Sequence, residues 1–132
     1  MKVYFVTQKN MKDRITLKPR IPETALDHEG LVARICVSSS ILGCMSAIGD
    51  NLHLGCKTYI YTCDVDPSEL VQPDRKDVYD VDMTGELWLL TEKEFILHRI
   101  IKCSNMDSFC VASKKCVRIN NFKFEIIYTN NK

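Results

Sequence analysis

The sequence predicts an α+β domain with a mainly antiparallel sheet, one principal helix and C-terminal β-hairpins. Three observations lead to this fold class. Strand-like segments dominate the chain, one segment has clear helical spacing, and strands and helices do not alternate as they do around a parallel sheet. The chain has 132 residues and an apolar fraction of 45%, which is enough for one core. We therefore expect a single domain over residues 1–132.

The N-terminal quarter begins with a short β-branched and aromatic run at residues 3–6, which predicts a buried strand. Residues 7–30 are polar and contain Pro19 and Pro22. Because proline lacks a donor and restricts the residue before it, we expect an extended, loop-like segment there. Residues 33–37, ARICV, predict a second strand.

The clearest helix signal follows this second strand. Ser38 or Ser39 is expected to cap the helix and Gly49 to end it. The apolar residues at helical spacing are Ile41, Leu42, Cys44, Met45 and Ile48. Residues 57–63 then alternate like a strand. Asp66 and Pro67 resemble an N-cap followed by a proline in the first helical position, so residues 68–71 are expected to form one short turn.

The C-terminal third is expected to consist of β-hairpins. Strands at residues 86–90 and 95–102 are separated by the short polar link 91–94. Strands at residues 116–119 and 122–128 flank Asn120-Asn121, and asparagine tolerates the positive φ that a tight turn requires.

Charge and hydropathy argue against several classes of partner. The 18 lysine and arginine residues nearly balance 17 acidic residues, for a formal charge of +1. So small a net charge argues against a polymeric nucleic acid or a membrane surface as the partner. The chain has no secretory leader and no run of about 18 apolar residues, so we expect a cytoplasmic protein.

Seven cysteines without any CxxC spacing favour small buried side chains over a zinc site. In a reducing cytoplasm they should remain free thiols. They are Cys36, Cys44, Cys56, Cys63, Cys103, Cys110 and Cys116. An acidic group around residues 64–86 lacks the DxDxDG calcium loop, so we expect no bound metal.

The usual catalytic and cofactor motifs are absent. The sequence contains no GxGxxG, no GxxxxGK[ST] and no GxSxG, so no cofactor is expected. The three histidines, His28, His53 and His98, have no spacing that singles one out as a base.

Arginines and a tryptophan are the candidate ligand-binding residues. A guanidinium binds phosphate oxygens through two parallel hydrogen bonds and also stacks on aromatic rings. The single tryptophan could be a core residue or a stacking platform for a base. These candidates are Arg20, Arg34, Arg75, Trp88 and Arg118. Together they suit a small anionic ligand.

Three strings resemble a known family in their order and residues. They are LKPRIP at residues 17–22, RICVS at 34–38 followed by the helical run 41–48, and GELWLL at 85–90. The pattern is similar to the phage-encoded Thoeris anti-defence sponges, type one. The resemblance covers residues 1–102, and residues 103–132 lie outside it.

The resemblance implies a non-enzymatic homo-oligomer, a homodimer or a ring of dimers, that acts in the bacterial host cell. It would capture a cyclic ADP-ribose isomer made by TIR-domain proteins, and members are also connected with cyclic oligonucleotide signals. Four of the residues considered lie in the matching strings: Arg20, Arg34, Glu86 and Trp88.

Two other classes of function remain open. In an ADP-ribosyltransferase-like enzyme, Glu86 would be the catalytic acid and Arg20 or Arg34 would hold the cofactor phosphates. Against it, residues 3–6 contain neither the histidine nor the arginine usual on an early strand. In a protein-binding inhibitor or antitoxin, an exposed edge strand or loop would form the contact.

Overall fold

The described residues form one curled antiparallel sheet of eight strands with a single α-helix. This computed structural model describes residues 1–21, 32–48, 55–73, 84–106 and 122–130. The elements are β1 (Lys2–Thr7), β2 (Arg14–Leu17), β3 (Ile35–Ser38), α1 (Ile41–Ala47), β4 (Lys57–Asp64), the 3₁₀ turn η3 (Pro67–Glu69), β5 (Leu70–Val71), β6 (Glu86–Leu89), β7 (Lys93–Met106) and β8 (Phe122–Thr129). The α+β class with a mainly antiparallel sheet and one helix is confirmed.

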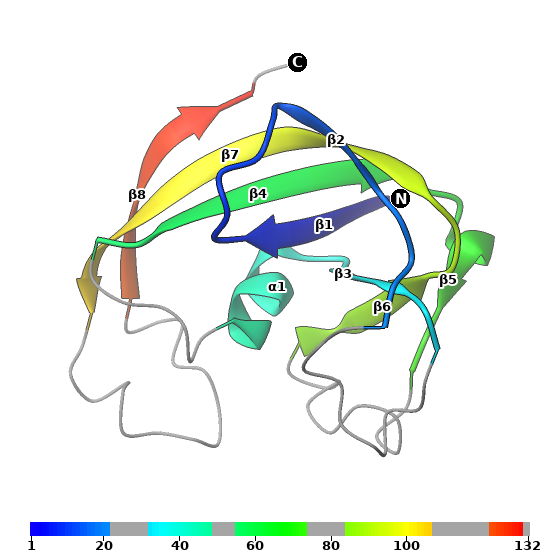
Figure 1. The fold of residues 1–132 in the computed structure, drawn as a ribbon. Helices are drawn as coiled ribbons and strands as arrows, with labels where there is room; N and C mark the ends of the chain where they lie inside the picture. The colour runs from blue at the N-terminus through cyan, green and yellow to red at the C-terminus, as the bar shows by residue number, and fades with distance from the viewer. Residues whose placement is uncertain (22–31, 49–54, 74–83, 107–121, 131–132) are drawn as a thin grey trace.

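The strand order is β2-β7-β4-β1-β3-β6-β5, with β8 paired to β7 beside that path. Figure 1 shows β1, β4 and β7 arching over β3, β6 and β5, so the sheet curls back toward itself. The chain segment after β2 then meets the start of β3 through a bridge between Arg20 and Arg34. The bridge brings segments from two distant parts of the strand order together.

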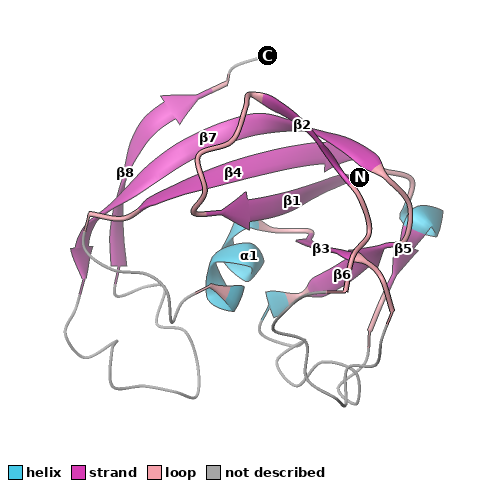
Figure 2. Cartoon of the chain, in the orientation of Figure 1, coloured by secondary structure: helices cyan, strands magenta, loops and turns pink. Residues whose placement is uncertain are grey.

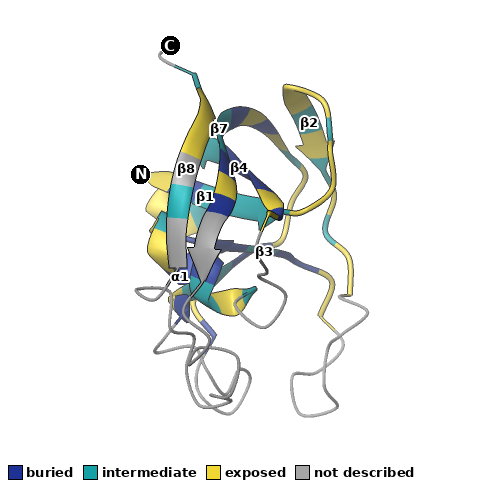
Figure 3. Ribbon diagram, turned by 90° about the vertical axis from the view of Figure 1, so that its left-hand side faces the viewer, coloured by how far each residue is buried: buried dark blue, intermediate teal, exposed yellow. Residues whose placement is uncertain are grey.

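Two apolar clusters lie on opposite faces of β1 because its side chains alternate. Val3 and Phe5 belong to the larger cluster, inside the curl, which also contains Tyr61, Leu89 and Phe95. Tyr4 and Val6 pack on a smaller cluster that includes Met45 of α1, together with Ile60, Ile101 and Cys103. Figure 3 shows buried positions, drawn in dark blue, along the strands that separate the two clusters.

The helix begins one or two residues later than the serine signal predicts. Ser40, not Ser38 or Ser39, is the N-cap, and its side chain accepts a hydrogen bond from the Gly43 N–H at 3.0 Å. Ser38 is instead the last residue of β3, and its hydroxyl donates to the Thr84 carbonyl at 2.9 Å. Gly49, the expected stop, lies outside the described residues, and the last helical residue is Ala47.

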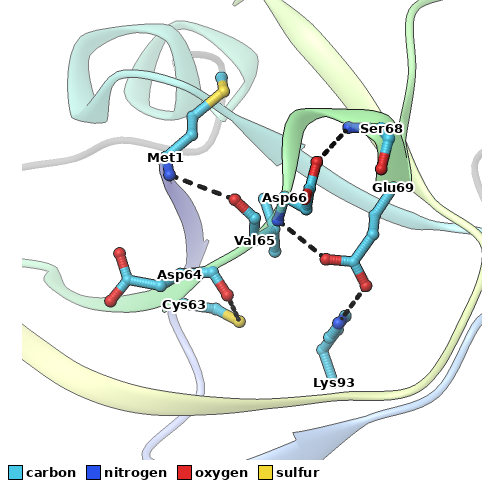
Figure 4. Close-up of polar contacts among 8 residues, drawn as sticks. All are labelled: Met1, Cys63, Asp64, Val65, Asp66, Ser68, Glu69 and Lys93. Atoms are coloured by element: carbon cyan, nitrogen blue, oxygen red, sulfur yellow. Dashed lines mark hydrogen bonds and ion pairs between the residues drawn. The ribbon is translucent and has the colours of Figure 1, made fainter.

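The Asp66-Pro67 signal is confirmed as the start of a helical turn, shown in Figure 4. The Ser68 N–H donates to the Asp66 carboxylate at 3.0 Å, and the Asp66 N–H donates to the Glu69 carboxylate at 2.9 Å. The backbone hydrogen bond from Ser68 lowers the pKa of Asp66. Glu69 also accepts a hydrogen bond from Lys93 of β7, which ties this turn to the sheet. The end of the expected turn, Leu70–Val71, is strand β5.

The expected hairpin between residues 86–90 and 95–102 is not found. Strand β6 pairs with β3 and β5, whereas β7 pairs with β4, β2 and β8. Each strand instead buries a side chain in the larger cluster, Leu89 from β6 and Phe95 from β7, and the exposed residues 90–92 connect the two strands. The other expected hairpin falls partly on residues 107–121, outside the described residues. Strand β8 is present and pairs with β7.

Candidate functional site

The β3–β6 strand pair has one apolar face and one polar face. Cys36 pairs with Trp88 and Ser38 pairs with Glu86. Because side chains directly opposite each other share a face and alternate along each strand, the residues on the polar face are Arg34, Cys36, Ser38, Glu86 and Trp88. The strand alternation therefore brings two candidate ligand-binding residues, Arg34 and Trp88, to one side of one strand pair together with Glu86.

A pocket of about 420 Å³ borders this strand pair. Figure 2 shows α1 and β3 close together beneath β1, and residues of all three elements line the pocket. Its lining consists of Phe5 and Val6 of β1; Leu17, Lys18 and Arg20 in or after β2; residues 34–38; Gly43, Cys44, Ala47 and Ile48 in or just after α1; and Thr84 and Glu86. The volume lies within the usual range for small-molecule sites.

The pocket carries positive charge on one side. Arg20 and Arg34 are joined through their backbones, with the Arg20 N–H donating to the Arg34 carbonyl at 3.1 Å and the Arg34 N–H donating back at 2.9 Å. Both residues line the pocket together with Lys18, and Glu86 is the acidic residue among the described lining residues. Three cationic side chains and one carboxylate favour an anionic ligand with hydrogen-bond donors.

Arg34 is the buried member of the pair, and contacts with Trp88 and Val32 hold its guanidinium in place. Arg34 is only 2% exposed, whereas Arg20 is exposed. The Arg34 guanidinium carbon lies 4.2 Å from the centroid of the Trp88 ring. Its Nη1 donates to the Val32 carbonyl at 3.1 Å. These contacts offset part of the cost of burying a charge.

The helix side of the pocket is tightly packed. A Cβ at Gly43 would lie 2.1 Å from the Thr84 carbonyl oxygen and 2.5 Å from Ser38 Oγ, so only glycine fits between α1 and these residues. The neighbouring Cys44 thiol donates to the Tyr4 carbonyl at 3.1 Å. Burial raises the pKa of Cys44 to about 12. The thiol therefore remains protonated at neutral pH and is a poor nucleophile.

The structure brings together part of the predicted site. Arg20 and Arg34 line the pocket, and Trp88 contacts Arg34 without being a lining residue. Trp88 is 5% exposed, so its position favours a packing role beside the pocket over a stacking platform for a ligand base. Arg75 and Arg118 lie outside the described residues, as do His28 and His53. His98 lies on β7, does not line the pocket, and packs at 5.9 Å from the Tyr4 ring.

Sequence reasoning missed several lining residues. Lys18 was noted only as part of a string, and Ser38 was expected to cap the helix. The signal for Ser38 was available, because alternation from Arg34 through Cys36 places it on the same face. Phe5 and Val6 were assigned to a buried strand, and no sequence signal shows that the end of this strand borders a pocket.

Other kinds of site find no support in the described part of the chain. It contains no cluster of three or more histidine, cysteine or acidic residues able to hold a metal ion. Its five cysteines, at positions 36, 44, 56, 63 and 103, are free thiols, and Cys110 and Cys116 lie outside it. Within the same ranges no helix has the length and apolar character needed to cross a lipid bilayer.

Comparison of the chain with protein-family models, with curated proteins and with solved structures finds no match.

Proposed function

We propose that this protein binds and sequesters a cyclic ADP-ribose-type immune signal without cleaving it. In this proposal it is a phage or prophage anti-defence sponge that acts in the cytoplasm of a bacterial host cell. Cyclic oligonucleotides are a second group of candidate ligands, because they share the phosphates, sugars and bases of the first. The identity of the signal and the biological setting come from the sequence resemblance described above.

The single observation that carries the proposal is the pairing of Arg20 and Arg34 along one pocket. A pyrophosphate has several anionic oxygens, and guanidinium groups bind such oxygens with charge-assisted hydrogen bonds. The carboxylate of Glu86 is an acceptor for sugar hydroxyls, and the apolar end of β1 at Phe5 and Val6 offers surface for a base. One ligand class that combines all three features is a nucleotide.

We further propose that the protein is a homodimer or a ring of dimers. Strand β8 pairs with β7 along one side, and its residues Ile126, Ile127 and Tyr128 are 55%, 47% and 40% exposed. Exposed strand edges and apolar side chains favour association with another chain. Light scattering at micromolar concentration should detect more than one chain per particle, and a clean monomer would contradict this assembly.

The test of binding uses the purified protein and a panel of cyclic ADP-ribose isomers and cyclic oligonucleotides. Calorimetry should show tight binding of at least one member. Heat denaturation should then release that ligand with unchanged mass, because sequestration does not alter it. Failure to bind any member of the panel would reject the sponge and favour a protein-binding inhibitor.

One pocket variant and a matched control locate the ligand. Charge-assisted hydrogen bonds contribute on the order of 1.5–3 kcal/mol each, so Arg20→Ala should weaken binding roughly 10- to 150-fold. Arg14→Ala is the matched control, because Arg14 is an exposed arginine of β2 that pairs with Glu94 and does not line the pocket. Binding by this control should remain within about twofold of the original protein. Equal losses in both variants would place the ligand elsewhere.

An ADP-ribosyltransferase-like activity is the second candidate, because Glu86 lines the same pocket as Arg20 and Arg34. In such an enzyme the carboxylate would assist loss of nicotinamide from NAD. Phe5 and Val6, the described β1 residues that line the pocket, are apolar and cannot exchange protons. Incubation with NAD separates the two candidates: release of nicotinamide that Glu86→Gln abolishes would support the enzyme, and recovery of intact NAD would support the sponge.

A further inference from the structure

We propose that Trp88 is a positioning residue that sets the anion affinity of the pocket through Arg34. The inference rests on the proposed function, since it requires an anionic ligand at the pocket. It assigns a role to the single tryptophan of the chain, which does not itself line the cavity.

The register of β3 and β6 explains why these two side chains meet. Trp88 lies opposite Cys36, so Arg34 is its diagonal neighbour on the same face of the strand pair. The guanidinium lies over the indole, 4.2 Å from its centroid. Both residues are almost fully buried, with 2% exposure for Arg34 and 5% for Trp88. In such a desolvated position a cation–π contact is stronger than at the surface.

A hydrogen bond fixes the indole in turn. Trp88 Nε1 donates to Glu86 Oε2 at 2.6 Å, and Glu86 lies two residues earlier on the same face of β6. This charge-assisted bond holds the ring in one orientation. The Val32 carbonyl accepts from Arg34 Nη1 and limits rotation of the guanidinium. Arg34 is therefore held in one orientation at the wall of the cavity before any ligand arrives.

This arrangement has an energetic consequence for binding. A flexible surface arginine loses side-chain entropy when it binds a phosphate, whereas a guanidinium already held in place loses less. Trp88 should thus raise affinity for anions by keeping Arg34 oriented, without touching the ligand. Arg20, which is exposed and lines the same pocket, supplies the adaptable half of the pair.

A double-mutant cycle separates this role from a general structural one. Calorimetry with cyclic ADP-ribose is performed on Trp88→Leu, on Arg34→Lys and on the double variant. Trp88→Leu alone should weaken binding roughly 3- to 30-fold, the range expected for a desolvated cation–π contact. Trp88→Phe keeps an aromatic face and should recover most of the loss. In the Arg34→Lys background, Trp88→Leu should have little further effect, because a flexible lysine does not use the stacking surface.

A second measurement avoids dependence on variants that fold poorly. Trp88 is the only tryptophan, so its fluorescence reports the Arg34 site directly in the unmodified protein. Titration with inorganic pyrophosphate or cyclic ADP-ribose should change its emission, and Arg34→Lys should reduce that change.

The outcomes distinguish the two proposals. Absence of ligand binding by calorimetry would reject the sponge. Normal binding with unchanged Trp88 emission, or additive losses in the double-mutant cycle, would reject the positioning role and leave the sponge intact.

Discussion

The two faces of the β3–β6 strand pair differ in what their side chains do. One face contributes to the larger apolar cluster, and its residues are Ile35, Val37, Leu87 and Leu89. The opposite face borders the pocket and includes Arg34, Ser38, Glu86 and Trp88. Four-residue strands thus serve two purposes at once, because successive residues point to opposite sides. A substitution can alter one function while leaving the other in place.

The two faces are stabilised in different ways. The apolar face gains from removal of hydrocarbon surface from water, which needs no particular partner. On the polar face the buried groups require specific partners: Arg34 has the Trp88 ring, Trp88 has the Glu86 carboxylate, and Ser38 has the Thr84 carbonyl. The polar face is therefore ordered by directional contacts. Such contacts suit a surface that must hold the Arg34 guanidinium at the pocket wall.

The largest expected effect is on stability, from Leu89→Ala on the apolar face. Leu89 is fully buried between the two sides of the curl, so truncation removes apolar contacts and leaves a cavity. The expected loss is about 2–5 kcal/mol in the free energy of unfolding, measured by urea denaturation. Ligand affinity of the fraction that remains folded should be nearly unchanged.

The adjacent Leu90 is a matched control for this prediction. It is the same residue type at the next position but is 45% exposed. Leu90→Ala should change the free energy of unfolding by no more than about 0.5 kcal/mol. If the two leucine variants lost stability equally, the assignment of Leu89 to the core would be wrong.

A smaller loss is expected from Gly43→Ala, where α1 meets the polar face. The new methyl group would overlap the Thr84 carbonyl, a backbone atom that cannot rotate away. Overpacking of this kind costs about 1–3 kcal/mol. Replacing glycine by alanine gains up to about 1 kcal/mol in helix propensity. Because the methyl group would meet a backbone atom, we expect the cost to exceed the gain. Because α1 must shift, ligand binding should weaken as well.

Leu42→Ala provides the comparison on the same helix, since Leu42 is 56% exposed. Calorimetric titration and thermal unfolding of both variants distinguish a shifted helix from a merely weakened one. Normal ligand affinity in Gly43→Ala would show that the pocket does not depend on this close approach.

The same alternation explains how much of the fold and site the sequence could predict. Strand positions near residues 3–6, 33–37 and 57–63 were recognised because each is a local pattern. The turn at Asp66 and Pro67 was recognised because its cap is also local. Arg20 and Arg34 were selected for their chemistry, and their backbone bridge places them together.

What the sequence did not reveal depends on contacts between distant segments. Strand β2 lies in a polar stretch and is a strand because it pairs with β7. Strand β6 pairs with β3, about 50 residues earlier, and with β5, although β7 follows it after only three residues. The role of Trp88 beside Arg34 likewise requires the register of two strands that no local pattern specifies. Arg75 and Arg118 lie outside the described residues and stay predictions.

The smallest expected effect concerns Cys44, at the helix side of the pocket. Burial raises the pKa of its thiol from 9.0 to about 12. The unfolded chain loses this proton near pH 9, whereas the folded protein keeps it until about pH 12. The contribution of Cys44 to stability is therefore fully present below pH 9 and declines as pH rises from about 9 to about 12. Near neutral pH the same shift makes the thiolate scarce.

Alkylation with iodoacetamide at pH 8 tests this directly, with modified peptides identified by mass spectrometry. Cys44 should react far more slowly in the folded protein than in urea, because both access and ionisation are suppressed. Cys63 is the internal comparison: burial also raises its pKa, but it is only half-buried and the charge of Lys93 acts in the opposite direction. It should be modified before Cys44. Equal rates for the two thiols would mean that water reaches the helix side of the pocket, and the polar face would then be less sealed than the packing around Gly43 requires.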